Sequence, residues 1–353
     1  MIHLAKGNIL KSNAEALVNT VNCVGVMGKG IALQFKKAFP DNYKAYEKAC
    51  KGNKVKPGKM FIFKTGEMYN PKYIINFPTK IHWKGKSKYE YIEAGLEDLK
   101  KQIIRRRIAS IAIPPLGSGL GGLNWNRVRS MIEAALEGLP KVQIYLFEPK
   151  GAPKPEEMPN RTSKPNMTEG RALFIKLIQQ YLELEYRLTL LEIQKLAYFL
   201  QEAGQNMRLH YVKHLYGPFA HNLNKALEHM EGHYISGYGD SPKPDIEIKL
   251  LPGAVEQADE FLKLRNEDKE RLEEVASLVD GFETPYGMEL LSSVHWLAAH
   301  EQVVYDSRSA IEQMGIWNDR KRRLFKPEHV KVAWDRIQEK GWNLSSGKIT
   351  SSC

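Results

Sequence analysis

Cysteine is scarce in this sequence, and long apolar runs are missing from it. Its 353 residues include three cysteines, Cys23, Cys50 and Cys353, and no pair has the C-x-x-C spacing. This pattern excludes a disulfide framework and a cysteine-based zinc site, so we expect no bound metal and a reducing, cytoplasmic compartment. The first residues lack the apolar core of a signal peptide, and no stretch reaches the roughly 20 apolar residues that cross a bilayer. We therefore expect no membrane partner.

The two halves of the chain differ in charge. The net charge is +11, but residues 1–150 carry 26 Lys and Arg against 11 Asp and Glu, whereas residues 166–353 carry 23 against 28. Within 228–289 the numbers are 6 and 16. A basic region suits a polyanion such as nucleic acid, and an acidic region suits a basic protein, for example one that binds DNA. The alternative is two solvated surfaces that differ without functional meaning.

The length allows two domains, and residues 1–150 alternate strand-like and helix-like segments. This alternation predicts an α/β layer fold, and a hairpin expected within 56–73 makes the sheet mixed. Strands are expected at Ile2–Lys6, Ala16–Asn19, Met60–Lys64, Tyr73–Phe77, Ile108–Ile113 and Val142–Phe147, and helices at Ile31–Ala38, Asn42–Lys51, Tyr89–Arg105 and Trp125–Glu137.

Residues 151–170 are predicted to be a linker, because Pro153, Pro155, Pro159 and Pro165 favour an extended chain there. Residues 171–353 are predicted to form a mostly helical second domain. Its helices are expected around Leu173–Tyr181, from a capping box at Thr189 to Gly204, and at Gly253–Phe261, Glu267–Val279, Tyr286–His300 and Pro327–Lys340, with a small sheet from Tyr211–Leu215 and Ile246–Leu251. The basic run Arg320–Arg323 suits a nucleic-acid contact or a solvated turn.

Two glycine-rich loops carry the strongest functional signal. The first is Gly25-Val26-Met27-Gly28-Lys29-Gly30, and the second is Pro114–Leu123, with four glycines in six residues. Each follows an expected strand and precedes an expected helix, where backbone N–H groups can approach a phosphate. Two such loops predict a diphosphate held from both sides. Neither has the spacing of a Walker or a dinucleotide-binding motif, and the alternative is tight turns that bind nothing.

Polar side chains follow two of the expected strands. Asn19 and Asn22 precede the first glycine loop, and Lys80 follows the strand Tyr73–Phe77. Ligands of open α/β sheets bind at the carboxyl ends of strands. A lysine that is partly desolvated there can act as a nucleophile or a proton carrier, although a solvated surface lysine is the ordinary case. His82 and Trp83 can stack on a base, or Trp83 can simply pack.

The segments Asn19–Ala32, Asn76–Trp83 and Pro114–Trp125 together resemble the macrodomain of the DarG family of DNA ADP-ribosyl glycohydrolase antitoxins, and the related human terminal ADP-ribose glycohydrolase branch. The resemblance covers about residues 1–150. It implies a three-layer α/β/α fold that binds ADP-ribose and needs no cofactor, with Lys80 of the Thr-Lys pair as the catalytic residue. Its implied ligand-binding residues are Asn8, Ile9, Asn19, Thr20, Asn22, Gly25, Val26, Met27, Gly28, Lys29, Gly30, Ile31, Thr79, Leu116, Gly117, Ser118, Gly119, Leu120, Gly121 and Phe147.

Individual positions of this resemblance carry specific expectations. Asn8 stands where many macrodomains have an aspartate that accepts from the adenine amino group, and its amide oxygen can still accept. Phe147 is the expected neighbour of adenine, with Tyr145 as the alternative and core packing as the ordinary explanation for either. The human branch uses an acidic residue in the second loop, but here that position is Gly121, and no Asp or Glu lies between Asp98 and Glu133.

In the second half, Leu191–Leu200 and Tyr216-Gly217-Pro218-Phe219 resemble the helical domain attached to these macrodomains. The resemblance implies an antitoxin of a type II toxin–antitoxin system. It would remove ADP-ribose from thymidine in single-stranded DNA and bind the DarT-type toxin through residues 171–353, with the acidic stretch as a DNA mimic. The alternatives are a reader of ADP-ribose, a hydrolase of protein-linked ADP-ribose, neutralisation by protein contact alone, and a helical domain that serves as a scaffold or for dimerisation.

Overall fold

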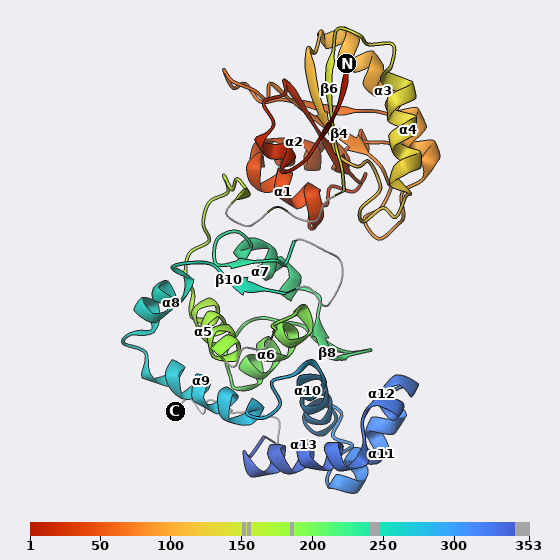
Figure 1. The fold of residues 1–353 in the computed structure, drawn as a ribbon. Coiled ribbons are helices and arrows are strands. Elements are labelled where there is room, and N and C mark those ends of the chain that lie inside the picture. Colours follow the sequence, from red (N-terminus) through yellow and green to blue (C-terminus); the bar gives the residue numbers. More distant parts are fainter. Residues whose placement is uncertain (150–152, 154–156, 184–186, 240–246, 343–353) are drawn as a thin grey trace. The chain divides into compact units, whose positions relative to one another are not determined.

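The computed structural model describes residues 1–149, 153, 157–183, 187–239 and 247–342 (Figure 1). The chain divides into two compact units, an N-terminal unit formed by residues 1–163 together with Gly239, and a helical unit formed by residues 164–238 and 247–342. Pro155 in the predicted linker, Ile246 in the predicted sheet and Cys353 lie outside the described residues. Among the helices described, none is long and apolar enough to cross a membrane.

A six-stranded mixed sheet forms the centre of the N-terminal unit, in the order β1-β6-β5-β2-β4-β3. All neighbours pair in parallel except β3 and β4, which form the expected antiparallel hairpin. The six predicted strands are confirmed, with bounds that move by two residues at most. They are β1 Ile2–Ala5, β2 Ala16–Val21, β3 Phe61–Lys64, β4 Tyr73–Pro78, β5 Ser110–Ile113 and β6 Gln143–Phe147.

Helices cover both faces of this sheet, which confirms the three-layer prediction. Alternate residues of a strand point to opposite faces. Ile75 and Phe77 on β4 therefore face the side covered by α3 and α4, whereas Ile74 packs with Phe35 of α1 on the other side. Gly95 lets α3 approach the sheet, because a Cβ there would lie 2.2 Å from the Phe77 ring. The helices are α1 Gly30–Ala38, α2 Pro40–Lys51, α3 Tyr89–Arg106 and α4 Trp125–Leu136.

Residues beyond β6 continue on the surface of the N-terminal unit. Arg161 donates its backbone N–H to Lys37 O at 2.8 Å, pairs with Glu67 at 3.3 Å, and places its guanidinium 5.8 Å from the centre of the Phe39 ring. The Asn8 amide donates to Glu157 O at 2.8 Å. Part of the predicted linker is therefore packed rather than free.

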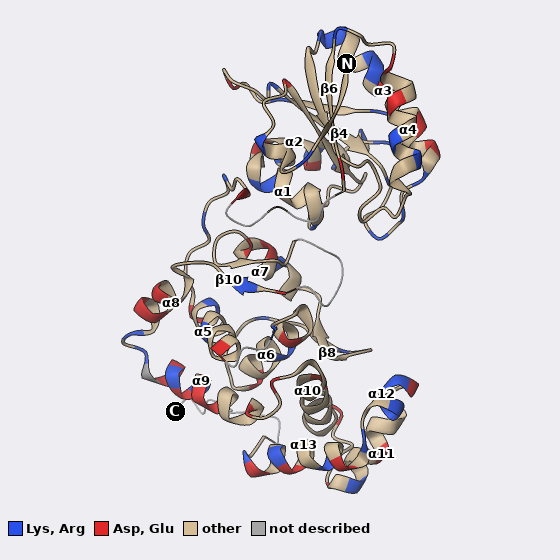
Figure 2. Ribbon diagram, viewed as in Figure 1, with Lys and Arg blue, Asp and Glu red and all other residues tan. Residues whose placement is uncertain are grey.

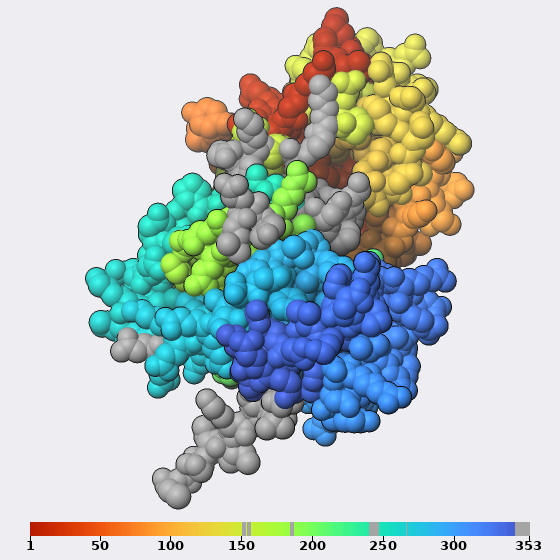
Figure 3. All heavy atoms as spheres, turned by 60° about the horizontal axis from the view of Figure 1, so that its bottom comes forward, coloured from red at the N-terminus to blue at the C-terminus, as the bar shows by residue number. Residues whose placement is uncertain are grey.

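The helical unit contains every helix predicted for it, and the capping box at Thr189 is present. Three further helices, α7, α11 and α12, were not predicted. Figure 3 shows the C-terminal helices as one packed body, in which α10, α11 and α13 contact one another. The helices are α5 Glu169–Glu183, α6 Leu190–Glu202, α7 Leu223–Met230, α8 Ala254–Leu262, α9 Asn266–Val279, α10 Pro285–Ala299, α11 Ser307–Trp317, α12 Asp319–Leu324 and α13 Pro327–Glu339. The prediction of one small sheet from Tyr211–Leu215 and Ile246–Leu251 is wrong, because these segments belong to two separate antiparallel pairs. β7 Tyr211–His214 pairs with β8 Gly217–Ala220, and β9 Ile235–Ser236 pairs with β10 Lys249–Leu250.

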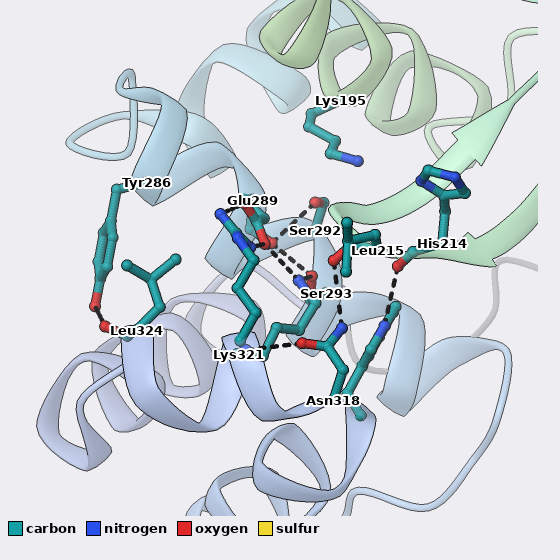
Figure 4. Close-up of polar contacts among 12 residues, drawn as sticks. Lys195, His214, Leu215, Tyr286, Glu289, Ser292, Ser293, Asn318, Lys321 and Leu324 are labelled. Atoms are coloured by element: carbon teal, nitrogen blue, oxygen red, sulfur yellow. Dashed lines mark hydrogen bonds and ion pairs between the residues drawn. The ribbon is translucent and has the colours of Figure 1, made fainter. Parts of the chain in front are cut away.

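A buried ionic cluster joins α10 and α12 (Figure 4). Glu289 on α10 is 1% exposed and accepts from Arg320 at 2.5 and 3.0 Å and from Lys321 at 2.8 Å. Lys321 also donates to Ser293 Oγ at 2.9 Å. The expectation of a solvated or DNA-binding run at Arg320–Arg323 is wrong for Lys321, because this cation is fully buried and neutralises a carboxylate inside the unit.

Lys195 on α6 ends beside the same cluster (Figure 4). Its Nζ donates to Pro218 O at 2.6 Å. Burial, and then the neighbouring Lys321 charge, lower the pKa of Lys195 to about 7. The turn between β7 and β8 can pack against this cluster because residue 217 is a glycine with a φ of +90°. A Cβ at Gly217 would lie 2.8 Å from Ser293 Oγ and 3.2 Å from Lys195 Nζ.

Candidate functional site

The candidate site lies at one edge of the sheet, where the carboxyl ends of all the parallel strands meet. Asn8 follows β1, the first glycine loop follows β2, Lys80 follows β4, the second glycine loop follows β5, and Phe147 ends β6. This is the edge at which open α/β sheets bind their ligands. The topology therefore places residues from five distant segments along one edge.

Asn22 shapes the first glycine loop. Its Nδ2 donates to Val26 O at 2.5 Å, and its Oδ1 accepts from the N–H groups of Val24 and Val26 at 3.0 and 3.3 Å. The Tyr46 hydroxyl holds it from below, donating to Asn22 O at 2.7 Å. Gly25 supplies the left-handed turn, with a φ of +82°. The loop is thus prearranged before any ligand binds.

The rest of this loop points partly outward. Val26 is exposed, Met27 is buried, and Gly28 and Lys29 are half-buried, with Thr20 and Ile31 at similar exposure on either side. Desolvation lowers the pKa of Lys29. Gly30, with a φ of +58°, begins α1, so the positive end of that helix lies at the first loop, and its first N–H donates to Gly239 O at 2.6 Å.

A network of buried asparagines supports the same loop. The Asn19 amide donates to Asn76 Oδ1 at 3.1 Å and lies 3.8 Å from Met27 Sδ, and the Asn76 amide donates to Asn42 Oδ1 at 2.7 Å. Asn19 is 0% exposed, and its Oδ1 has no partner among the described residues. Asn19 therefore lies beneath the loop, and direct contact with a ligand would require the network to open.

The second glycine loop is closely packed at two of its glycines. Gly117 has a φ of +65°, and a Cβ there would lie 2.9 Å from Leu123 and 3.0 Å from Ser87. A Cβ at Gly121 would lie 2.2 Å from Ser87 Oγ and 2.3 Å from Gly117 O. The position at which the human branch carries a carboxylate therefore has no room for one here.

The remaining residues of the second loop differ in exposure. Leu116 is fully buried, and Ser118 Oγ donates to Leu116 O at 3.3 Å. Gly119 and Leu120 are exposed, and no atom lies within 4 Å of a Cβ placed on Gly119. The open part of the loop is therefore its tip.

Lys80 lies where the loops meet. Thr79, which is buried, fixes the start of its segment by donating its backbone N–H to Val21 O at 3.0 Å, and Lys80 Nζ donates to Leu120 O at 3.2 Å. The Leu120 side chain in turn lies 3.5 Å from a Cβ position on Gly30, so the two glycine loops are in contact. Desolvation lowers the pKa of Lys80 below its usual range. The amine is half-buried and aimed into the loop junction, as a nucleophile or a proton carrier requires.

The predicted adenine end is more enclosed. Asn8 is 8% exposed, its Oδ1 accepts from Leu10 N at 2.9 Å, and its Nδ2 is bonded to Glu157 O. An aspartate could not make this second bond, which explains the asparagine. Phe147 and Ile9 are buried in one cluster, with Tyr145 at its border. Contact of Phe147 with adenine stays a prediction.

Sequence reasoning missed Asn42, Asn76 and Ser87 as supports of this site. Asn76 offered a signal, because a polar residue within the apolar strand β4 needs a buried partner. Ser87 offered none: its buried hydroxyl, which has no partner among the described residues, is brought against the second loop only by the tertiary fold.

This architecture is that of a macro domain, and the macro domain family matches residues 18–132. The whole chain is 46% identical to the DNA ADP-ribosyl glycohydrolase of Thermus aquaticus, covering 97% of this chain and 94% of that protein. It is 40% identical to the DNA ADP-ribosyl glycohydrolase of Mycobacterium tuberculosis, covering 96% and 99%. The chain belongs to the DNA ADP-ribosyl glycohydrolase family, hydrolases that act on the glycosidic bonds of ADP-ribose.

A third relative places this domain in one chain with a transferase. The DNA ADP-ribosyl transferase–DNA ADP-ribosyl glycohydrolase fusion protein of Thermosipho africanus is 35% identical over 161 residues, which are 41% of this chain and 42% of that protein. In that protein, a domain similar to this one is therefore joined to a DNA ADP-ribosyl transferase.

Proposed function

We propose that the N-terminal unit hydrolyses the bond that joins ADP-ribose to a thymidine base in DNA, and that the helical unit binds the toxin that makes this modification. Membership of the family and the basic charge of residues 1–150 support the substrate. The observation that carries the activity is the position of Lys80, whose Nζ lies at the junction of the loops in surroundings that lower its pKa.

In the proposed mechanism, the two glycine loops hold the diphosphate through backbone N–H groups, with α1 contributing its positive end. Lys80 acts at the anomeric carbon of the distal ribose. As a free amine, it bonds to that carbon while the bond to the base breaks, and the departing base takes the proton that the alkylated nitrogen loses. Water then adds to the carbon, releases ADP-ribose and returns a proton to the nitrogen, which restores the amine. As an ammonium, it gives its proton to the departing base while water adds to the carbon. Because Gly121 leaves no room for a carboxylate, Lys80 and the diphosphate are the groups that remain to assist water.

The decisive assay measures ADP-ribose released from a single-stranded oligonucleotide modified at thymidine. We expect Lys80→Ala to lower the rate by a factor of about 100 or more while ADP-ribose binding, measured by calorimetry, is kept. Lys64→Ala, at the opposite end of the sheet, is the matched control and should behave as wild type. If wild type binds ADP-ribose but releases none, the unit is a reader. If Lys80→Ala is as active as wild type, the proposed role of this amine is wrong.

Toxin binding is assigned to an acidic face formed by the exposed carboxylates of α8 and α9, two helices on which Figure 2 marks several acidic positions. Both helices pack on α5 and carry exposed carboxylates on the outward side. A basic DNA-binding groove would be attracted to such a face as it is to DNA phosphates. The exposed acidic residues are Glu256, Asp259, Glu260, Glu267, Glu270, Glu273 and Glu274.

A charge-reversal experiment in the full chain tests this face. Glu273→Lys with Glu274→Lys should weaken binding to the purified toxin by about tenfold or more, and less so at high salt. Glu312→Lys with Glu328→Lys, which changes the same charge on α11 and α13, is the control. Equal loss in both double variants would show that overall charge, and not this face, determines binding.

A further inference from the structure

The segment after Lys80 carries large side chains into solvent at the border of the site. Trp83 is 50% exposed and Ile81 is 55% exposed, and Ile81 is tied to the first loop by the hydrogen bond from Cys23 N to Ile81 O at 2.9 Å. Val26 and Leu120, on the two glycine loops, are exposed as well. Apolar side chains gathered at the entrance of a site are typical of a surface that a ligand covers.

Two aromatic rings in this segment are already stacked. The ring centres of His82 and Trp83 lie 5.4 Å apart, with 30° between their planes. Short hydrogen-bonded turns hold them, from Lys84 N to His82 Nδ1 at 3.2 Å and from Gly85 N to His82 O at 3.0 Å. A base added to this stack would find its aromatic partners already ordered, which reduces the entropy lost on binding.

The charges around these rings are positive. Lys84 Nζ lies 5.1 Å from the centre of the Trp83 ring, Lys86 and Lys88 are exposed, and the sequence contains no Asp or Glu from 68 to 89. Further on, the Arg127 guanidinium lies 3.9 Å from the centre of the Tyr89 ring. Alternating aromatic and basic side chains fit single-stranded nucleic acid, whose bases stack and whose phosphates attract cations.

We propose that Ile81–Lys88 is a shelf for the DNA strand, on which a base next to the modified thymidine stacks on Trp83 and His82 while Lys84 and Lys86 contact phosphates. This inference rests on the proposed function and gives it a determinant of specificity. Lys80 acts on any ADP-ribosyl thymidine, whereas the shelf favours one that is part of a strand. A duplex fits poorly, because its bases are stacked on one another.

The test compares two substrates, a thymidine-modified single-stranded oligonucleotide and the ADP-ribosyl thymidine nucleoside alone. Trp83→Ala should lower kcat/KM for the oligonucleotide by about tenfold or more and leave the nucleoside unchanged. Trp83→Phe should restore most of the loss. Tyr69→Ala removes an exposed aromatic ring from the β3–β4 turn at the opposite end of the sheet and should have no effect. Equal effects of Trp83→Ala on both substrates, or none on either, would overturn the proposal.

Binding to an unmodified single-stranded oligonucleotide, measured by fluorescence anisotropy, separates the shelf from the chemistry. Trp83→Ala must weaken this binding whether or not the modified oligonucleotide is hydrolysed. Lys84→Ala with Lys86→Ala should reduce the slope of log affinity against log salt by about 0.7 for each phosphate that the protein no longer neutralises. Lys64→Ala is the control. An unchanged slope in the double variant, or unchanged binding by Trp83→Ala, refutes the shelf even if ADP-ribose release is confirmed.

Discussion

The variant Gly121→Asp distinguishes two explanations of this site, one in which a carboxylate would assist catalysis and one in which it would disrupt the packing of the second glycine loop. By analogy with the human branch, Gly121→Asp should restore a catalytic acid. In this structure its Cβ would lie 2.3 Å from Gly117 O, so this oxygen must retreat by about 1 Å to reach the 3.4 Å of ordinary contact. Forcing atoms into a packed site costs typically 1–3 kcal/mol. We therefore expect Gly121→Asp to destabilise the N-terminal unit.

The expected loss is measurable in both stability and activity. At about 2–4 °C for each kcal/mol, the melting temperature of the N-terminal unit should fall by about 2 to 12 °C. The displaced loop carries Leu120 O, the partner of Lys80, and a misplacement of about 1 Å can lower the rate by about 100-fold. Scanning fluorimetry with and without ADP-ribose and the oligonucleotide assay measure the two effects.

A matched variant isolates the packing. Gly119→Asp introduces the same charge into the same loop, but at a position where no atom lies within 4 Å of the new Cβ. Its melting temperature should stay near that of wild type. The packing argument is refuted if Gly121→Asp has the same melting temperature as Gly119→Asp and hydrolyses the oligonucleotide as fast as wild type or faster. A mechanism assisted by a carboxylate at this position would then be supported.

Three further changes test other parts of the fold. The pKa of Lys195 is about 7 in the folded protein and 10.5 in an unfolded chain. Between these two values the unfolded state binds more protons, so the free energy of unfolding rises with pH in that window. Lys195→Met should flatten this rise, as measured by denaturant titrations at several pH values. Gly217→Ala should destabilise the helical unit more than Gly281→Ala, since both have a positive φ but only Gly217 is crowded, and urea midpoints compare them. Asn8→Asp removes the donor to Glu157 O, so limited proteolysis should cut the segment after β6 faster than in wild type.

Local patterns in the sequence were enough to predict the order of the strands and helices in the N-terminal unit. Alternating apolar residues and glycine-rich turns depend on neighbours a few positions away, and the six strands and four helices follow them closely. The prediction for the helical unit was less complete. α11 begins with an Asp306 box that uses Ser309 in place of Glu or Gln, so it lacks the usual capping-box pattern. α12 has only six residues, too few to show a helical period.

The sequence by itself determined that an α/β layer with two glycine loops precedes a helical region, and that Lys80 follows a strand at the edge where ligands bind. Only the tertiary structure decided that Asn19 lies beneath the first loop, bonded to Asn76, that Gly121 has no space for a carboxylate beside Ser87, and that Lys321 is buried against a glutamate. These facts depend on pairs separated by some 30 to 60 residues. Periodicity and propensity describe only near neighbours, and close packing between distant segments is what settles such pairs.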